Sequence, residues 1–320
     1  MLSVANYHYI REDFSAPYPS IFGLSPKQFR KQLEALAKHG SFISLKELLE
    51  FRQKPFDRNY LLITFDDGLK EQYELAKPIL EELGIPYIFF INTANFQEQQ
   101  VSLVHKIHLL RSQVSSEELL NELAKHTNLV LDRAEEKLAI FHYNYDEEKT
   151  AILKYLLNFK LSLPEQQAFI NPLFQQLYDE SFVAAELYFT DEMLQDLHSQ
   201  DVLGSHSHHH LPLGQLTRED LKHELEMTQA FFMERFGSPS KAISYPYGSY
   251  EACRGIKEEV AAFGFELGFT MERATNASLQ EDSLLLSRYD CNDLPLGKND
   301  LFTGTSLFQK PELRRWKDEM

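Results

Sequence analysis

Two adjacent aspartates, Asp66 and Asp67, are the clearest candidates for chemistry in this sequence. They belong to the run TFDDG at 64–68, which directly follows the apolar residues YLLI at 60–63. Neighbouring strand residues point to opposite faces, so both carboxylates can serve one site only where the backbone leaves the strand. An ordinary Asp-Gly hairpin turn is the alternative, but a helical pattern follows rather than a paired strand. The pair could therefore hold a metal ion and a proton acceptor side by side.

A histidine cluster about 140 residues further on offers the nitrogen ligands that such a metal would need. The run HSHHH occupies 206–210 and follows a predicted strand at 202–205. A histidine-rich surface loop is the alternative. Asp67, His206 and His210 would supply one oxygen and two nitrogens and leave positions open for water and substrate, which is a catalytic rather than a structural metal pattern. Such a ligand set suits Zn²⁺ best, although other first-row divalent ions also accept it.

The surrounding pattern predicts an α/β fold that brings both motifs to one edge of a sheet. Short apolar strands are predicted at 60–65 and 86–91, and the helix between them ends at Gly84. This strand, helix and strand spacing is typical of a parallel unit, whose ligands bind at the carboxyl ends of the strands. The alternation resumes from 201 to 270, with another strand predicted at 242–245.

Composition excludes several classes of protein. The 320 residues are 43% hydrophobic, with 32 basic against 48 acidic residues and a net charge of -16, so nucleic acid is not an expected partner. We expect no transmembrane segment, because no stretch approaches about 18 apolar residues, and no export signal is apparent. The two cysteines, Cys253 and Cys291, favour a reduced cytoplasmic setting over a disulfide framework. The oligomeric state cannot be read from the sequence.

Taken in order, three motifs resemble those of the polysaccharide deacetylase family (NodB-homology domain, carbohydrate esterase family 4). They are TFDDG at 64–68, HSxxH at 206–210 with Leu213 after it, and YPYG at 245–248. The resemblance implies an α/β fold, an irregular (β/α) barrel of about seven strands, over 1–320 as a single domain. The Leu-, Glu- and Lys-rich stretch at 97–190 would be a helical insertion within it.

The resemblance also implies roles for individual residues. Asp66 resembles the general base of the family, and Asp67, His206 and His210 resemble its metal ligands. The backbone N–H of Tyr247 would face the oxyanion that develops during the reaction. The reaction implied is metal-dependent removal of an acyl group, usually acetyl, from an amino sugar.

Two departures from the family pattern bear on the catalytic residues. Ser244 stands where the third motif usually begins with an arginine that helps to orient the base, and no histidine follows His223 to serve as the usual acid. A circularly permuted subgroup, resembling the poly-N-acetylglucosamine deacetylases, carries its acid histidine on the first strand. His8 fits that position and is expected to be the acid; the alternative is an ordinary histidine at a strand end.

Two further residues are candidates for contact with the sugar. Tyr245, like Tyr247, could stack against a sugar ring or could be a packed aromatic. Arg288 could bind substrate or orient the site together with Asp290, on a strand predicted at 284–290, or could form a surface ion pair.

The function expected is therefore hydrolysis of an N-acyl group on an amino sugar or glycan, possibly within surface-polysaccharide biosynthesis. Two alternatives stay open. The first is a non-catalytic carbohydrate-binding scaffold that keeps the barrel, suggested by Ser244 and the missing C-terminal histidine. The second is a deacylase of a non-sugar amide.

Overall fold

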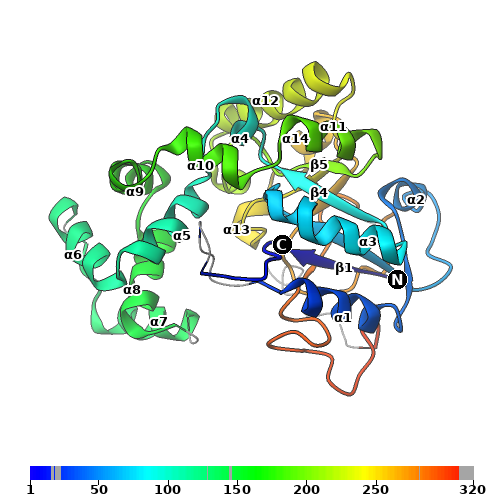
Figure 1. Ribbon diagram of the computed structural model, residues 1–320, viewed down its shortest axis with the longest axis horizontal. Helices are drawn as coiled ribbons and strands as arrows, with labels where there is room; N and C mark the ends of the chain where they lie inside the picture. The colour runs from blue at the N-terminus through cyan, green and yellow to red at the C-terminus, as the bar shows by residue number, and fades with distance from the viewer. Residues whose placement is uncertain (16–17, 19–22, 128, 144–145, 281, 310–320) are drawn as a thin grey trace. The chain divides into compact units, whose positions relative to one another are not determined.

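The computed structural model describes residues 1–15, 18, 23–127, 129–143, 146–280 and 282–309. The chain divides into two compact units. The larger unit contains the sheet, and the smaller one is built mainly from Val101–Val183. Figure 1 labels helices of both units and, among the strands, β1, β4 and β5.

The larger unit is organised around a parallel sheet. Its strands are β1 (Leu2–Tyr7), β2 (Ser41–Phe42), β3 (Tyr60–Phe65), β4 (Tyr87–Ile91), β5 (Leu203–Ser205), β6 (Ala242–Ser244), β7 (Leu267–Phe269) and β8 (Tyr289–Asp290). Seven of these strands follow one another in the order β7-β6-β5-β4-β3-β1-β8, and β2 pairs with β3. The paired strands are parallel, so their carboxyl ends meet at one edge.

One segment near the C-terminus bonds to both β7 and β1. Its first part bonds to β7, where Gly268 N–H donates to the Ser283 carbonyl at 2.9 Å and Leu286 N–H donates to the Gly268 carbonyl at 2.7 Å. Its last part is β8, which pairs with β1. The sheet is therefore curled, and one stretch of chain bridges β7 and β1. The prediction of an irregular (β/α) barrel of about seven strands is confirmed.

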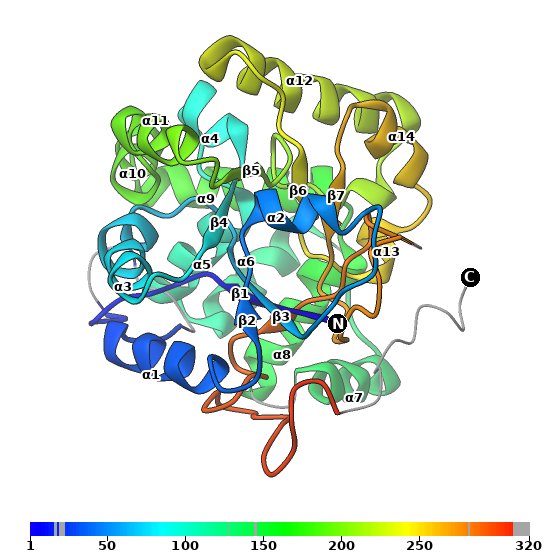
Figure 2. The ribbon, with the colours of Figure 1, turned by 90° about the vertical axis from the view of Figure 1, so that its right-hand side faces the viewer.

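Helices flank the strands of the larger unit, as Figure 2 shows for α1, α3, α11, α12 and α14. Helix α1 begins with a capping box at Ser25. The predicted end of α3 at Gly84, which has a left-handed φ of 63°, is confirmed. The helices are α1 (Pro26–Leu36), α2 (Leu45–Glu50), α3 (Lys77–Leu83), α4 (Thr93–Gln97), α11 (Asp191–Ser199), α12 (Arg218–Phe236), α13 (Tyr250–Cys253) and α14 (Lys257–Ala262), with a π-helical turn at Gln72–Ala76 and a 3-10 turn at Leu213–Gln215.

A cluster of buried aromatic rings fixes the strand that leads into the two aspartates. Phe65 of β3 packs against Tyr7 of β1 with ring centroids 5.4 Å apart, against Phe89 of β4 at 4.8 Å and against Phe29 of α1 at 5.7 Å. Each such pair contributes about 0.5–1.5 kcal/mol beyond the burial of its area. The residue before Asp66 is thus tied to two neighbouring strands and a helix.

The smaller unit is helical. It contains α5 (Leu103–Gln113), α6 (Ser116–His126), α7 (Arg133–His142), α8 (Glu148–Tyr155), a π-helical turn at Leu156–Lys160 and α9 (Leu163–Leu177), and the boundary between the units falls within α10 (Glu180–Leu187). Helices α5–α9 lie within the stretch 97–190, which the sequence predicts to be helical. Over the part of the chain that the structure describes, no helix combines the length and the apolar character that crossing a membrane requires.

Candidate metal and catalytic site

The turn after β3 meets the condition under which both aspartates can serve one site. Asp66 still continues the ladder of β3, because its N–H donates to the Tyr7 carbonyl at 3.1 Å. Asp67 and Gly68 then take φ values of 80° and 65°, in the left-handed region. A Cβ on Gly68 would stand 2.8 Å from Cγ2 of Ile91, so this turn requires glycine. The backbone leaves the strand between the two carboxylates, and a non-glycine residue in this conformation is a mark of functional strain.

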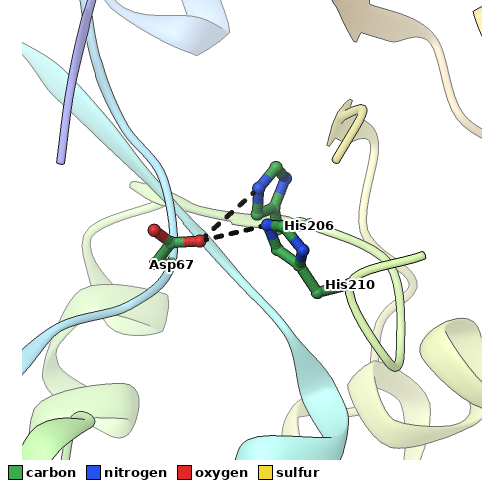
Figure 3. A group of neighbouring side chains, drawn as sticks. All are labelled: Asp67, His206 and His210. Atoms are coloured by element: carbon green, nitrogen blue, oxygen red, sulfur yellow. Dashed lines mark ion pairs between the residues drawn. The ribbon is translucent and has the colours of Figure 1, made fainter. Parts of the chain in front are cut away.

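Asp67, His206 and His210 converge on one point, as Figure 3 shows. Oδ1 of Asp67 lies 3.7 Å from Nε2 of His206 and 3.5 Å from Nε2 of His210. These distances exceed those of good hydrogen bonds. Two ligands of a tetrahedral zinc ion, each about 2.1 Å from it, are about 3.4 Å apart. All three side chains are buried. The donor atoms and their spacing therefore fit a divalent ion held by the three residues expected from the sequence.

The strand beside β5 orients His206. Nδ1 of His206 lies 2.7 Å from the carbonyl oxygen of Ser244 at the end of β6, so this nitrogen carries the proton and Nε2 is left to face Asp67. Burial lowers the pKa of His206, although the carboxylates of Asp66 and Asp67 act in the opposite direction. A neutral imidazole is the form that binds a metal.

Arg288 holds Asp66 in place. Nη1 of Arg288 donates to Oδ1 of Asp66 at 3.0 Å and Nη2 donates to Oδ2 at 2.9 Å, which is a bidentate pair. The arginine side chain is completely buried, and that of Asp66 is 3% exposed. Burial by itself would raise the pKa of Asp66, but Arg288 and His206 outweigh it and hold the pKa below its usual range. Asp66 is therefore ionised at neutral pH.

Ser244 and Asn6 complete the surroundings of this ion pair. The Ser244 hydroxyl accepts a hydrogen bond from Nη2 of Arg288 at 2.8 Å. Nδ2 of Asn6 donates to Oδ2 of Asp66 at 2.9 Å, and Oδ1 of Asn6 accepts from Nη1 of Arg288 at 2.8 Å. Ser244 thus contacts an arginine that comes from elsewhere in the chain. Asn6 was not singled out from the sequence; its register opposite Thr64 in β3, at the carboxyl end of β1, is the signal that would have identified it.

His8 lies beside the proposed base. Its Nε2 is 3.9 Å from Oδ2 of Asp66, and its side chain is 36% exposed. The backbone at His8 is held by Gln72, whose Nε2 donates to the His8 carbonyl at 2.8 Å and also bonds the Asp66 carbonyl at 2.6 Å. A partly exposed imidazole at the edge of a buried carboxylate can reach a substrate.

Tyr247 lies next to the candidate metal ligands. Its ring centroid is 5.2 Å from that of His210, and its side chain is 43% exposed. Its φ of 62° is left-handed, and the following Gly248 is also left-handed, at 58°. Within the described residues, no backbone carbonyl accepts a hydrogen bond from the Tyr247 N–H. This N–H can therefore serve an oxyanion beside the metal ligands.

Two sugar-binding expectations need correction. Tyr245 is 1% exposed and its hydroxyl donates to the Leu284 carbonyl at 2.8 Å, so it is a packed aromatic rather than a surface for a sugar ring. Arg288 is too deeply buried to contact substrate or to form a surface pair, and its carboxylate partner is Asp66 rather than Asp290. Oδ1 of Asp290 instead accepts from the N–H of Asn292 at 2.8 Å. Arg288 belongs to the segment that bridges β7 and β1, and its side chain points into the protein toward Asp66.

The fold and the site together define a curled (β/α) barrel with a buried carboxylate next to a candidate His-His-Asp metal site. A model of the polysaccharide deacetylase family matches residues 53–161 and 179–267, which is more than half of the 320 residues. The chain belongs to the polysaccharide deacetylase family.

Curated relatives carry a more specific name. Poly-beta-1,6-N-acetyl-D-glucosamine N-deacetylases from several Staphylococcus aureus strains, including MSSA476 and N315, are 31% identical over 155 residues, which is 44% of this chain and 51% of theirs. The chain thus matches about half the length of these relatives.

Solved structures show the same fold at low identity. Streptococcus pyogenes deacetylase PplD, in complex with acetate, superposes with a TM-score of 0.53 at 15% identity, over 90% of this chain and 91% of that one. A de-N-acetylase from Aggregatibacter actinomycetemcomitans gives a TM-score of 0.52 at 12% identity, over 90% and 94% of the two chains. These likenesses support the barrel assignment made from the sheet.

Proposed function

We propose that this protein is a metal-dependent hydrolase that removes an N-acyl group, usually acetyl, from an amino sugar or glycan. The observation that carries the proposal is the bidentate contact between buried Arg288 and Asp66, next to Asp67, His206 and His210. An ionised carboxylate held beside three converging metal ligands suits hydrolysis, because it can accept a proton from a water molecule. Membership of the polysaccharide deacetylase family supports the same chemistry.

Asp67, His206 and His210 would hold the ion, which we propose to be Zn²⁺. When bound, it would supply Lewis-acid activation of a water molecule and of the amide carbonyl. Asp66 takes the proton from the attacking water. Arg288 and Asn6 keep both oxygens of this carboxylate in a fixed position, which limits the reorganisation that proton transfer requires.

His8 and Tyr247 would act on the reacting amide together with Asp66. The Tyr247 N–H would donate to the negative charge that develops on the carbonyl oxygen. Such a contact is worth about 10²–10³ in rate in other hydrolases. Protonated His8 would give its proton to the departing amine, because an amine leaves poorly unless it is protonated. The partial exposure of His8 lets a large substrate approach it.

We propose a glycan containing N-acetylglucosamine as substrate. The support is the name of the Staphylococcus aureus relatives, which act on poly-beta-1,6-N-acetyl-D-glucosamine. A cytoplasmic setting is also part of the proposal and would favour a nucleotide- or lipid-linked sugar in surface-polysaccharide synthesis over a mature polymer. The two free, buried cysteines, Cys253 and Cys291, are consistent with a reducing compartment. Fractionation of cells that express the full-length protein tests the location.

The experiment is acetate release by zinc-loaded protein from N-acetylglucosamine oligosaccharides of graded length. We expect release from at least one length, and a loss of about 10²–10⁴ in kcat for Asp66→Asn, the usual contribution of a general base. Zinc content should be unchanged in this variant, because Asp66 is not among the three converging ligands. A fully metal-loaded wild-type protein that releases no acetate from any oligosaccharide would refute the assignment.

The same substrate panel separates the two alternatives. A non-catalytic scaffold would bind the oligosaccharides equally well as wild type and as Asp66→Asn, with no turnover in either. A deacylase of non-sugar amides would release acetate from simple N-acetyl amides and leave the sugars intact. The intact pair of Asp66 and Arg288 argues against the scaffold, since a buried ion pair is costly to keep without a use.

A further inference from the structure

A second group of potential metal ligands stands on the same histidine run. His208 and His209 lie between the two proposed ligands of the catalytic ion, and with Glu98 they form a separate cluster in which one donor atom of each residue lies within 4.8 Å of the others. Glu98 is the residue at which α4 ends. The reaction proposed above uses none of these three side chains.

The donor atoms are close enough to share one ion. Oε1 of Glu98 lies 3.0 Å from Nε2 of His208 and 3.6 Å from Nε2 of His209. Ligands about 2.1 Å from a common ion lie about 3.0 Å apart at a right angle and about 3.4 Å apart at a tetrahedral angle. The measured distances fall within a few tenths of an ångström of these values.

Each imidazole is held through its other ring nitrogen. Nδ1 of His208 lies 2.7 Å from Oγ1 of Thr93, at the start of α4. Nδ1 of His209 lies 2.5 Å from Oε1 of the buried Glu224 on α12. Oε2 of the same Glu224 accepts the backbone N–H groups of His208 and His209 at 3.1 and 2.9 Å. Histidines that bind metals usually donate their other ring N–H to a carboxylate, a backbone carbonyl or water, which fixes the tautomer and the ring orientation. Glu224 has this role for His209, and the Thr93 hydroxyl has the corresponding position for His208.

Exposure makes the cluster accessible to ions from solution. The side chain of His208 is completely buried, whereas those of His209 and Glu98 are 32% and 33% exposed. The site therefore opens to solvent on one side, in contrast to the three buried ligands around Asp67. An ion held by three protein ligands at an open position should bind more weakly and exchange faster than the buried one.

We propose that Glu98, His208 and His209 form a second site for a divalent transition-metal ion. Two imidazole nitrogens and one carboxylate oxygen suit Zn²⁺, Co²⁺ or Ni²⁺ rather than Mg²⁺ or Ca²⁺. An ion there would join α4 to the loop that carries His206 and His210. The competing explanation is a hydrogen bond, in which His208 Nε2–H donates to Glu98 and no ion is involved.

Zinc titration of the full-length, metal-free protein tests the proposal, with a chromophoric chelator as competitor and without any activity measurement. We expect two Zn²⁺ ions per chain, one tight and one weaker. Glu98→Gln and His209→Ala should each weaken the second ion by more than about tenfold, the smallest loss seen when a hydrogen-bonded partner of a ligand is removed. The amide oxygen introduced by Glu98→Gln can still accept the hydrogen bond from His208, so the fold should survive.

Variants elsewhere give matched controls. His126 and Glu122 form an exposed histidine and glutamate pair on α6, 3.3 Å apart, with two potential ligands instead of three. Glu122→Gln and His126→Ala should leave both ions in place, and Asp67→Asn should remove the tight ion but keep the weaker one. A wild-type protein that binds a single Zn²⁺ would overturn the proposal. So would a second ion that survives both Glu98→Gln and His209→Ala.

Discussion

Replacing Arg288 by methionine gives the sharpest test of how the base is held. The change keeps a long side chain but removes both hydrogen bonds to Asp66, whose carboxylate is then buried without a cation. Loss of one partner of a buried ion pair costs about 3–5 kcal/mol. We expect the free energy of unfolding to fall by that amount at neutral pH.

The pH dependence of this loss is more diagnostic than its size. In the wild type the pKa of Asp66 lies below its unfolded value, so Asp66 contributes stability that is present above about pH 3.9 and is lost as the pH falls through the folded pKa. In the variant, burial without Arg288 should raise the pKa above its unfolded value. The folded state then loses stability as the pH rises from about 4 through the new pKa. The total loss is about 1.4 kcal/mol for each unit by which the folded pKa exceeds the unfolded one. His8 and His206 face the same carboxylate and limit the increase in the pKa of Asp66.

The assay is urea unfolding of both proteins from pH 4.5 to 7.5 in the presence of a chelator. Arg30→Met is a matched control, because Arg30 forms an equally bidentate pair with Glu82 on the surface. Breaking that exposed pair should cost about 0–1 kcal/mol, with little change across this pH range. The reasoning fails if Arg288→Met costs no more than Arg30→Met. It also fails if the loss for Arg288→Met is the same at pH 4.5 and pH 7.5.

Two shorter predictions concern the acid and the turn. For His8→Gln we expect the kcat of acetate release to fall by about 10²–10⁴, with zinc content unchanged, because the departing amine would lose its proton donor; an unchanged kcat would exclude His8 as the acid. For Gly68→Ala we expect a loss of stability of about 1–3 kcal/mol in thermal or urea unfolding, because the left-handed φ of 65° and the contact with Ile91 both oppose a Cβ. Gly84→Ala separates the two causes. Gly84 has a similar φ but open space around it, so this variant should lose only the part of the stability that is due to φ.

The sequence by itself determined the local features of this protein. A short apolar run followed by TFDDG predicted a buried strand that ends in a turn, and the order of the motifs identified Asp66, Asp67, His206 and His210 as a group. Parallel sheets bind ligands where the carboxyl ends of their strands meet. The position of these four residues after strands of one sheet was therefore enough to predict that they lie together. Gly84 likewise located the end of α3.

Only the tertiary structure decided what surrounds Asp66. Arg288 is 222 residues away from it in the chain, and contact depends on how the segment after β7 returns to bridge β7 and β1. Because side chains on a strand alternate between faces, a shift of one residue in that segment would turn Arg288 outward and leave Asp66 unpaired. Tyr245 illustrates the same limit: whether an aromatic at a strand end meets solvent or the core depends on elements distant in sequence, here the Leu284 carbonyl. The reacting groups could be read from local motifs, whereas the residues that orient them are set by long-range register and burial.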